Sequence, residues 1–451
     1  MKFIVGGNGG RESAIVEALA KSLEVTEIIC CVGNPGIAAT RLRKNGELVE
    51  CIPIPAGSIR ELLAFACERF PTLAERAEVT LIVGSEDLLA AGITDMFLAK
   101  GFKVYGPKLK AAELEISKVF SQGFMEKYDI PHARGGVFTD VQGALGFVTG
   151  ELGGRGVVKW PYPVKGKGVF PCEDVAQAKT MLEKLLIEGI FPTPKGRATE
   201  VVVQEFLEGP EMSLQAVFAG DSYVPFEGSQ DHKRALEGDN GGMTGGMGAF
   251  SPTPFFRTAS SWGSGLIELQ KQVFDGILRG CVMEGLDFCG TVFPGIILTE
   301  KGGKVLEINA RWPDPETQPT LARLQTDFAL IVDAAVNRRL NTLQPLHWDP
   351  RHAATVVLAS GGYPDPYQTG KVITGLAAAD NIPGAVIHHA GTKQFGNEIR
   401  TDGGRVLGVT VIRPSLQEAV SVANGIAEQI QFEGKHFRRD IGSKALAHYS
   451  D

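Results

Sequence analysis

Short apolar runs alternate with longer amphipathic segments at the start of the chain. The runs fit strands at 2–7, 26–34, 79–85 and 103–107, and the amphipathic segments fit helices at 11–22, 58–70 and 88–101. Strands that alternate with helices in this way predict a doubly wound, parallel α/β sheet. Ligands of such sheets bind beyond the carboxyl ends of the strands, and the glycine-bearing turns GGNGGRES, VGNPG and VGSEDLLAAG fall there.

The pattern then changes to an α+β arrangement. Strands or hairpins are expected at 156–170, 200–209, 211–220 and 294–312, and helices at 175–186 and 262–284. Turn and linker residues in NRRLNTLQPLHWDP indicate a boundary near 335–345. After this boundary, 352–364 and 408–412 fit strands and 415–430 fits a helix, which predicts a small strand-rich module.

Composition narrows the class of protein. The 451 residues are 43% apolar and 22% charged, which is typical of a globular protein with several domains. The net charge of −7 argues against a dedicated nucleic-acid binder. The start MKFIVGGNGG lacks a signal-peptide pattern and no apolar run is long enough to span a bilayer, so no membrane partner is expected. The seven cysteines show no CxxC spacing, which favours reduced thiols and a cytoplasmic location.

Residues 230–250, QDHKRALEGDNGGMTGGMGAF, fit neither an amphipathic helix nor a strand. They begin with polar and ionisable residues and continue with many glycines, which let a backbone approach small polar ligands closely. No histidine pair has metal-ligand spacing. His232 is the one histidine expected near a site, because it lies between Asp231 and Lys233. The sequence also lacks GxSxG and an evidently activated cysteine, so covalent catalysis by the protein is not expected.

Two glycine-rich turns are candidates for phosphate binding. GGNGG precedes a helix, where unpaired N–H groups and the helix dipole favour anions, although a purely structural tight turn has the same pattern. KGKGV at 165–169 follows Lys159 and lies between two strand-like runs. Its lysines and glycines suit a loop that closes over a polyphosphate, and they equally suit a solvated basic hairpin.

EINARW at 307–312 points to a metal site. Glu307 and Asn309 are two residues apart on an expected strand, so both side chains emerge on one face. Carboxylate and amide oxygens suit magnesium, which usually shares its coordination shell with substrate phosphates. Arg311 continues the same face and could bind a carboxylate or phosphate. The alternative to a metal site is an ordinary edge strand on which polar and apolar side chains alternate.

Several longer motifs extend this picture over nearly the whole chain. They are GNGGRE, YGPKLKAAELEISKVF, QEFLEG, SQDHKR, TGGMGAFSPTP, DPETQP, HAGTK, GGRVLGVT and RRDIG. With these motifs the chain resembles the glycinamide ribonucleotide synthetases, also called phosphoribosylamine–glycine ligases, of the ATP-grasp superfamily. The resemblance implies an N-terminal α/β substrate-binding domain at 1–116, an ATP-grasp domain at 117–340 with a mobile lid at about 137–206, and a C-terminal domain at 341–451.

The resemblance also implies roles for individual residues. ATP would be bound by Lys118, Lys159, Gly166, Lys167, Gly168, Glu205, Phe206, Leu207 and Glu211. The other substrates would be bound by Gly9, Gly10, Arg11, Glu12, Asn34, Glu86, His232, Arg234, Gly245, Gly246, Met247, Asp314 and Glu316. Arg311, Asp231 and Lys233 would act in catalysis, and Glu307 and Asn309 would hold Mg²⁺ or Mn²⁺.

The chemistry that this family implies needs no protein nucleophile. The carboxylate of glycine attacks the γ-phosphate of ATP, which gives glycyl phosphate and releases ADP. The amine of phosphoribosylamine then attacks this acyl phosphate and expels phosphate. Catalysis by such a site consists mainly of positioning and charge neutralisation. The expected partners are small-molecule substrates, and the expected assembly is a monomer or weak dimer.

Some residues depart from the pattern of the family. Ser13 stands where the family usually has histidine, and GSE at 84–86 where it has GPE. The other departures are Met243, Pro294, Trp312 and Pro313. A few substitutions in a pocket can change the substrate of an enzyme. A paralogue that uses another acid or amine is therefore an alternative, and a catalytically silent ATP-binding module is a second.

Overall fold

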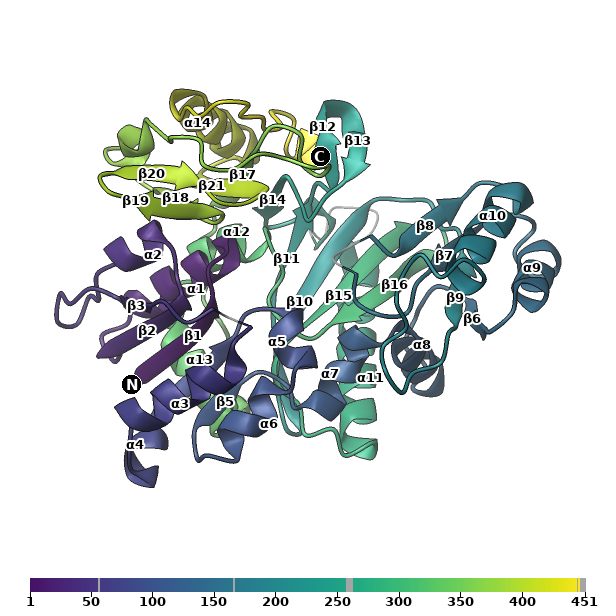
Figure 1. Ribbon diagram of the computed structural model, residues 1–451, viewed down its shortest axis with the longest axis horizontal. Helices are drawn as coiled ribbons and strands as arrows, with labels where there is room; N and C mark the ends of the chain where they lie inside the picture. Colours follow the sequence, from purple (N-terminus) through teal and green to yellow (C-terminus); the bar gives the residue numbers. More distant parts are fainter. Residues whose placement is uncertain (56, 165–166, 257–262, 444, 447–451) are drawn as a thin grey trace.

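The computed structural model describes residues 1–451 except 56, 165–166, 257–262, 444 and 447–451. Figure 1 shows the N-terminal sheet and the C-terminal module stacked on one side of the molecule, strands β6–β9 on the other, and a long sheet between them. Within the described part of the chain, no helix is both apolar and long enough to cross a bilayer.

Parallel strands form the N-terminal sheet in the order β3–β2–β1–β4–β5, which confirms the predicted doubly wound domain. The strands are β1 (Lys2–Gly7), β2 (Glu27–Val32), β3 (Glu50–Ile52), β4 (Val79–Val83) and β5 (Lys103–Tyr105). The central strands β1 and β4 are covered on both faces, which explains why they read as continuous apolar runs. The helices are α1 (Gly10–Ala20), α2 (Pro35–Ala39), α3 (Ile59–Arg69), α4 (Leu73–Arg76), α5 (Glu86–Ala90), α6 (Ile93–Leu98) and α7 (Leu109–Ile116).

The single helix expected at 88–101 is wrong, because α5 and α6 are separate helices. Gly92 between them has φ 75°, a left-handed conformation that ends one helix and redirects the chain into the next. The apolar spacing continues across the break, so periodicity alone did not reveal it. The short α5 places Glu86 at its first turn.

A smaller antiparallel sheet has the order β6–β9–β7–β8 and is called the lid sheet below. Its strands are β6 (Gly135–Phe138), β7 (Gly156–Lys159), β8 (Val169–Cys172) and β9 (Val201–Glu205). Two helices, α9 (Val141–Gly150) and α10 (Val175–Leu186), pack on it around a core that includes Trp160, Tyr162 and Val203. Helix α8 (Lys118–Lys127) precedes the lid sheet in the chain.

The long sheet continues from the central body into the C-terminal module. Its order is β16–β15–β10–β11–β14–β17–β21–β18, and β14 pairs with β17 at the junction. The strands are β10 (Glu211–Ala219), β11 (Ser222–Asp231), β14 (Gly248–Ser251), β15 (Cys289–Thr299), β16 (Gly302–Asn309), β17 (His352–Ala359), β18 (Ala385–His389) and β21 (Arg405–Arg413). Helices α11 (Gly263–Met283), α12 (Thr317–Arg323), α13 (Phe328–Val336) and α14 (Leu416–Gln429) and the hairpin β19 (Thr392–Phe395)–β20 (Glu398–Thr401) complete the fold.

Residues 230–250 contain regular structure that the sequence pattern did not indicate. They form a short hairpin, β12 (Arg234–Leu236) and β13 (Asn240–Met243), followed by β14. Gly238 and Asp239 turn the hairpin with φ of 66° and 54°. Strands this short have too few side chains to show an alternation of period two, so glycine and charge dominated the pattern.

Candidate active site

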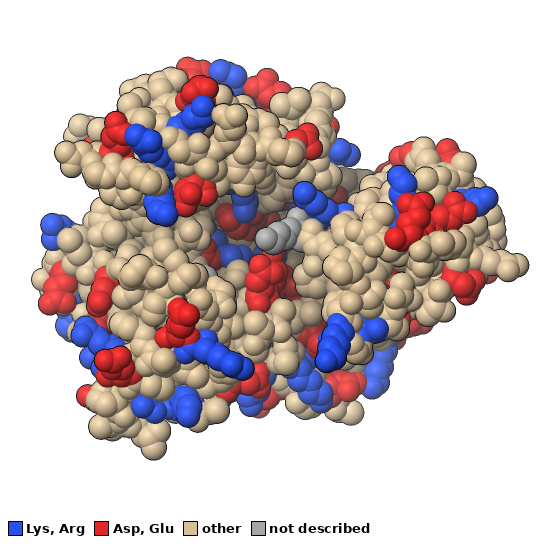
Figure 2. Space-filling model, viewed as in Figure 1, with Lys and Arg blue, Asp and Glu red and all other residues tan. Residues whose placement is uncertain are grey.

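A cleft lies between the long sheet, the N-terminal domain and the lid sheet. It holds about 850 Å³ of empty space, and Figure 2 shows acidic and basic side chains gathered in this hollow at the centre of the molecule. Elements from three parts of the chain contribute its walls. The polar lining residues are Glu86, Glu115, Lys118, Ser121, Lys159, Gln204, Glu307, Asn309 and Arg311.

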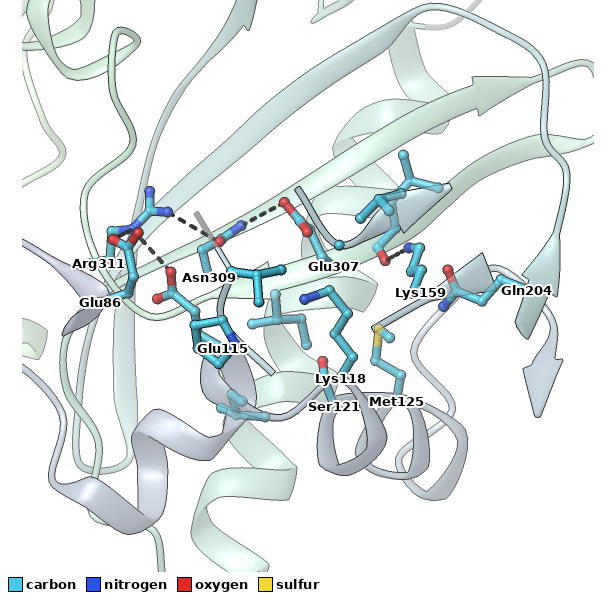
Figure 3. Close-up of a pocket in the computed structure, with 17 residues that line it drawn as sticks. Glu86, Glu115, Lys118, Ser121, Met125, Lys159, Gln204, Glu307, Asn309 and Arg311 are labelled. Atoms are coloured by element: carbon cyan, nitrogen blue, oxygen red, sulfur yellow. Dashed lines mark hydrogen bonds and ion pairs between the residues drawn. The ribbon is translucent and has the colours of Figure 1, made fainter. Parts of the chain in front are cut away.

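Two lysines enter the cleft from different elements (Figure 3). Lys118 begins α8, where the hydroxyl of Ser117 caps the helix by accepting the N–H of Phe120 at 3.2 Å. Lys159 ends β7, is buried, and donates from Nζ to the carbonyl of Leu306 at 3.1 Å. Burial lowers the pKa of Lys159 to about 8. Anionic phosphate beside this ammonium would offset that cost of burial.

Glu307 and Asn309 both face the cleft from β16, as their spacing predicted. Asn309 Nδ2 donates to Glu307 Oε1 at 3.3 Å. Burial disfavours charge on Glu307, but the ammonium groups of Lys233, Lys118 and Lys159 outweigh it and hold the pKa of this carboxyl at about 2. Glu307 is therefore an ionised carboxylate next to the amide of Asn309, and the oxygens of these two side chains are hard donors of the kind that magnesium prefers when phosphates and water complete the shell.

Arg311 lies just after β16 and is held by two carboxylates. Its Nε is 3.1 Å from Glu115 Oε1 and 3.5 Å from Glu86 Oε2, and its Nη2 donates to Asn309 Oδ1 at 3.4 Å. Glu115 also accepts the N–H of Ala310 at 2.8 Å. Burial raises the pKa of Glu115, while the guanidinium of Arg311 opposes this shift. These contacts fix the guanidinium beside the Glu307–Asn309 pair.

Asp231 and Lys233 lie within the same electrostatic network. The charge of Asp231 raises the pKa of Lys233, whose Nζ lies 4.0 Å from Glu211 Oε2. Burial raises the pKa of Asp231, and burial together with the charge of Asp231 raises that of Glu316. Glu316 also accepts a hydrogen bond from Ser213 Oγ at 3.0 Å. The structure thus brings the predicted residues Asp231, Lys233, Glu211 and Glu316 into the field that surrounds Glu307.

His232 and Arg234 point elsewhere. His232 Nε2 accepts the N–H of Gly442 at 3.0 Å, and the ring packs on Phe250 with 6.2 Å between ring centroids. Arg234 is exposed and donates from Nη1 to the carbonyl of Gly241 within the hairpin. Neither residue is among the described residues that line the cleft. Their substrate contacts stay predictions.

The first glycine turn is filled by a protein carboxylate. Glu12 Oε2 accepts the N–H of Gly9 at 2.8 Å, and Glu12 Oε1 pairs with Arg11 Nε at 2.7 Å. Arg11 also donates from Nη1 to the carbonyl of Trp312 at 3.1 Å. A Cβ on Gly84 would lie 2.1 Å from Glu12 Oε1, so glycine is required there. A Cβ on Gly10, where α1 begins, would lie 2.7 Å from Gln318 Nε2.

Asn34 and Ser13 join the N-terminal domain to the C-terminal module. Asn34 Nδ2 donates to the carbonyls of Asn8 and His389, both at 2.9 Å, and to Ser13 Oγ at 3.1 Å. Ser13 Oγ donates to the same His389 carbonyl at 2.5 Å. Asn34 Oδ1 caps α2 by accepting the N–H of Ile37. The structure therefore gives Asn34 a bracing role, and its substrate contact stays a prediction.

The turn at Gly245–Met247 is held by the C-terminal module. Arg405 Nη1 donates to the carbonyls of Gly245 and Asp314, both at 2.8 Å, and Arg405 Nη2 pairs with Asp314 Oδ2 at 2.6 Å. The hydroxyl of Tyr363 accepts the N–H of Gly245 at 3.1 Å. Gly246 has φ 114°, and Met247 is buried. The sequence did not mark Arg405 and Tyr363 as site residues, although Arg405 lies in the quoted motif GGRVLGVT.

The end of β9 carries the segment expected to meet the adenine base. Glu205 Oε1 accepts the N–H of Arg134 at 2.7 Å and also pairs with Lys304, so its side chain faces the protein. The ring of Phe206 lies 4.3 Å from the guanidinium carbon of Arg155. Leu207 is half-buried.

The lid loop is described only in part. Lys167 is exposed and donates its backbone N–H to the carbonyl of Val164 at 3.1 Å. Gly168 lines the cleft, and a Cβ there would lie 2.7 Å from Val164 Cγ2. Gly166 lies outside the described residues. The ATP contacts of this loop stay predictions.

Glu115 is the clearest lining residue that sequence reasoning missed. It lies in the quoted motif YGPKLKAAELEISKVF, three residues before Lys118, but no pattern of spacing singled it out. Only the fold shows that it meets Arg311, which is far away in the sequence.

Comparison with known proteins identifies the family. Models described as phosphoribosylglycinamide synthetase match residues 1–115 (N domain), 116–317 (ATP-grasp domain) and 353–444 (C domain). The chain belongs to the phosphoribosylglycinamide synthetase family. Membership explains why residues from three parts of the chain converge on one cleft, and the ATP-grasp domain implies use of ATP, for which Mg²⁺ is typical.

Relatives in the phosphoribosylglycinamide synthetase family match end to end. A phosphoribosylamine–glycine ligase of Caldanaerobacter subterraneus is 38% identical over 98% of this chain and 100% of the relative, and one of Vibrio cholerae is 37% identical over 99% of each. The crystal structure of the phosphoribosylamine–glycine ligase of Thermotoga maritima has a TM-score of 0.79 at 28% identity and covers 98% of this chain and 100% of that one. A biotin carboxylase domain of Hydrogenobacter thermophilus shares the fold alone, with a TM-score of 0.69 at 16% identity over 97% of this chain and 91% of that one.

Proposed function

We propose that this chain ligates glycine to 5-phosphoribosylamine at the expense of ATP, in purine biosynthesis. The observation that carries the proposal is the end-to-end match with phosphoribosylamine–glycine ligases. The cleft supports it, because Lys118, Lys159, Glu307, Asn309 and Arg311 all face one space. Lysines and an arginine around an ionised carboxylate suit a triphosphate and its metal ion.

The residues of the cleft supply charge and position. Lys118 and Lys159 would neutralise the phosphates, and Arg311, held by Glu115 and Glu86, would orient the carboxylate of glycine. Glu307 and Asn309 would hold Mg²⁺, which neutralises phosphate charge when it is bound. No step requires a nucleophile from the protein, because the carboxylate of the substrate attacks the terminal phosphate and forms the acyl phosphate.

Asp231 and Lys233 would serve the acceptor side. Their strand end faces the same electrostatic network, and Lys233 carries a positive charge next to Glu211 and Glu307. A fixed ammonium in a buried site stabilises the developing phosphate leaving group. The charge of Asp231 is the main cause that favours this ammonium, while burial raises the pKa of the carboxyl groups of Asp231 and Glu316.

The alternative, a paralogue for another acid or amine, is not favoured. None of the six departures, Ser13, Ser85, Met243, Pro294, Trp312 and Pro313, is among the described residues that line the cleft. Trp312 is buried in a core with Phe226 and Phe328, and Ser13 joins two domains. Trp312 and Ser13 therefore act in packing and in a domain contact, and the side chain of Met243 is exposed.

An assay of ADP release tests the proposal. Purified protein is mixed with ATP and Mg²⁺ and offered a panel of small amino acids, each with and without phosphoribosylamine. We expect ADP only with glycine and phosphoribosylamine together, and a product with the mass of glycinamide ribonucleotide. Turnover with another acid would support the paralogue, and tight ATP binding without turnover would support the silent module.

A further inference from the structure

The hairpin that follows Asp231 is held by the far end of the chain. Figure 1 shows β12 and β13 beside the C-terminal module. The contacts come from residues 438–442, the motif RRDIG, which the proposed chemistry does not use. We call residues 231–247 the substrate loop and residues 438–442 the C-terminal bracket.

Arg438 is the centre of the C-terminal bracket. Its side chain is 1% exposed and makes a two-point pair with Asp440, through Nε to Oδ1 and Nη2 to Oδ2, both at 2.8 Å. Its Nη1 reaches the substrate loop and donates to Asp239 Oδ1 at 2.8 Å and to the carbonyl of Arg234 at 3.1 Å. Asp440 Oδ2 also accepts the N–H of Gly238 at 2.9 Å. The first strand of the hairpin and its turn are thus held by one guanidinium–carboxylate pair.

A second contact of the C-terminal bracket, the hydrogen bond between Gly442 and His232, orients the segment that enters the loop. The N–H of Gly442 donates to His232 Nε2, so the proton of this imidazole is on Nδ1 and the ring faces the C-terminal module. Side chains alternate along an extended chain, so Asp231 and Lys233 point to the opposite side from His232. On the side to which Asp231 and Lys233 point lie Glu211, Glu307 and Glu316. The bracket therefore helps to set which way the two predicted catalytic side chains face.

The other end of the loop is anchored to the same module, through Arg405 and Tyr363 at Gly245. Beyond these anchors, the carbonyl of Met247 accepts the N–H of Val357 on β17 at 3.0 Å, and β14, which follows the loop, pairs with β11 and β17. Polar side chains of the C-terminal module therefore help to hold the loop in place.

We propose that Arg438 is a positioning residue for the substrate loop, and that through Asp239 and the Arg234 carbonyl it holds Asp231 and Lys233 in place for the acid and amine substrates. This inference rests on the proposed function. Arg438 touches no part of the cleft itself, so its effect is on the acceptor side. ATP, whose predicted contacts are Lys118, Lys159, the lid loop at 166–168, residues 205–207 and Glu211, should bind largely independently of it.

The variants Arg438→Met and Arg438→Lys test this role by steady-state kinetics with each substrate varied in turn. Arg438→Met is expected to raise the KM for glycine and phosphoribosylamine by roughly tenfold or more, because lost support of a positioned group typically costs that much. The KM for ATP should change by less than about twofold. Arg438→Lys keeps the charge but loses the two-point pair, so an intermediate KM is expected.

Arg323→Met is the matched control for a general loss of stability. The side chain of Arg323 is 2% exposed, so it is buried like that of Arg438. It pairs with the carboxylate of Glu227 and donates to the carbonyls of Arg351 and Asp349. None of these groups belongs to the substrate loop. Arg323→Met should lower Tm about as much as Arg438→Met does. It should leave unchanged the ratio of the KM for glycine or phosphoribosylamine to the KM for ATP. Asp239→Asn removes the charge that pairs with Arg438 in the substrate loop, at a partly exposed position. It should raise the KM for glycine and phosphoribosylamine as Arg438→Met does, with little loss of Tm.

Hydrogen exchange separates this inference from the proposed function. The N–H groups of Thr244 and Met247, which donate to the carbonyls of Lys233 and His232, should exchange roughly tenfold faster in Arg438→Met than in Arg323→Met. Unchanged exchange would overturn the positioning role whether or not the wild-type protein makes glycinamide ribonucleotide. An equal rise in the KM for ATP would overturn it as well. Failure of wild-type turnover alone would refute only the proposed function.

Discussion

Glu307 shows how the charge of one residue depends on its neighbours. Its place within the cleft would by itself favour the protonated carboxyl, yet the ammonium groups of Lys233, Lys118 and Lys159 keep it ionised. The dependence is mutual, because the same carboxylate is the main partner that opposes the lowered pKa of Lys159. The cleft is therefore balanced in charge before any ligand enters it.

Glu307→Gln should lower kcat/KM by at least about 100-fold, since it removes a metal ligand and the charge that balances the lysines. The side chain keeps its size, so the fold should persist. ADP release under saturating Mg²⁺ and the thermal midpoint measure the two effects. Glu398→Gln, at an exposed position on β20, is the control and should leave turnover unchanged. Near-normal turnover by Glu307→Gln would refute the metal assignment.

Among single residues, the sequence predicted those site residues that a short spacing along the chain relates to one another. Glu307, Asn309 and Arg311 were found because a spacing of two places side chains on one face of a strand. Glu115 and Arg405 were missed because their partners, Arg311 and Asp314, are distant in the sequence. Asn34 was found for its place at a strand end, but local sequence could not show that its amide is used to join two domains.

Among the elements, α11 matters because it supports the helix that presents Lys118. Gly280 of α11 sits against the rings of Phe124 and Tyr128 on α8, and a Cβ there would lie 2.2 Å from Phe124 Cζ. Gly265 of the same helix has no atom within 4 Å of such a Cβ. The close approach of the two helices therefore depends on one glycine and not on the other.

Gly280→Ala should destabilise the protein by about 1–3 kcal/mol, because overpacking forces ring or backbone shifts. Gly265→Ala should instead be neutral or stabilise it by up to about 1 kcal/mol, since alanine restricts the unfolded chain. Chemical denaturation of both variants measures the difference. If Gly280→Ala were as stable as Gly265→Ala, the described packing of α8 on α11 would be wrong.

The sequence predicted long elements better than short ones. The helix at 175–186 and the strand at 2–7 match α10 and β1, because each has enough residues for its periodicity to show. The break at Gly92 and the hairpin at β12–β13 were missed, since each depends on a backbone conformation that apolar spacing does not encode. The lid sheet was anticipated as a region, but its strand order required the structure.

For the whole molecule, a hydrogen-bonded contact between Glu17 and His388 joins the first domain to the last. His388 Nε2 on β18 lies 2.9 Å from Glu17 Oε2 on α1, and Lys21 also contacts Glu17. Burial opposes ionisation of Glu17, but His388 and Lys21 lower the pKa of this carboxyl from 4.5 to about 2. The pair thus stabilises the folded state above about pH 4.5, and this contribution is lost as the pH falls towards 2.

Glu17→Gln should therefore reduce the free energy of unfolding by about 3 kcal/mol near neutral pH and by progressively less as the pH falls below about 4.5. Urea denaturation at several pH values measures this convergence with the wild-type curve. Glu433→Gln, which removes an exposed partner of Lys371, is the control and should run parallel to wild type. A constant offset for Glu17→Gln at every pH would contradict the lowered pKa of Glu17.

The junction of β14 with β17 limits how this protein can be divided. A fragment that ends near residue 345 would lack β17, and the backbone groups of β14 that pair with it would face water. Open strand edges recruit other chains, so such a fragment should self-associate instead of behaving as an independent ATP-binding unit. Any split version of the enzyme should therefore keep β14 and β17 in one polypeptide, or supply the missing piece at the moment of folding.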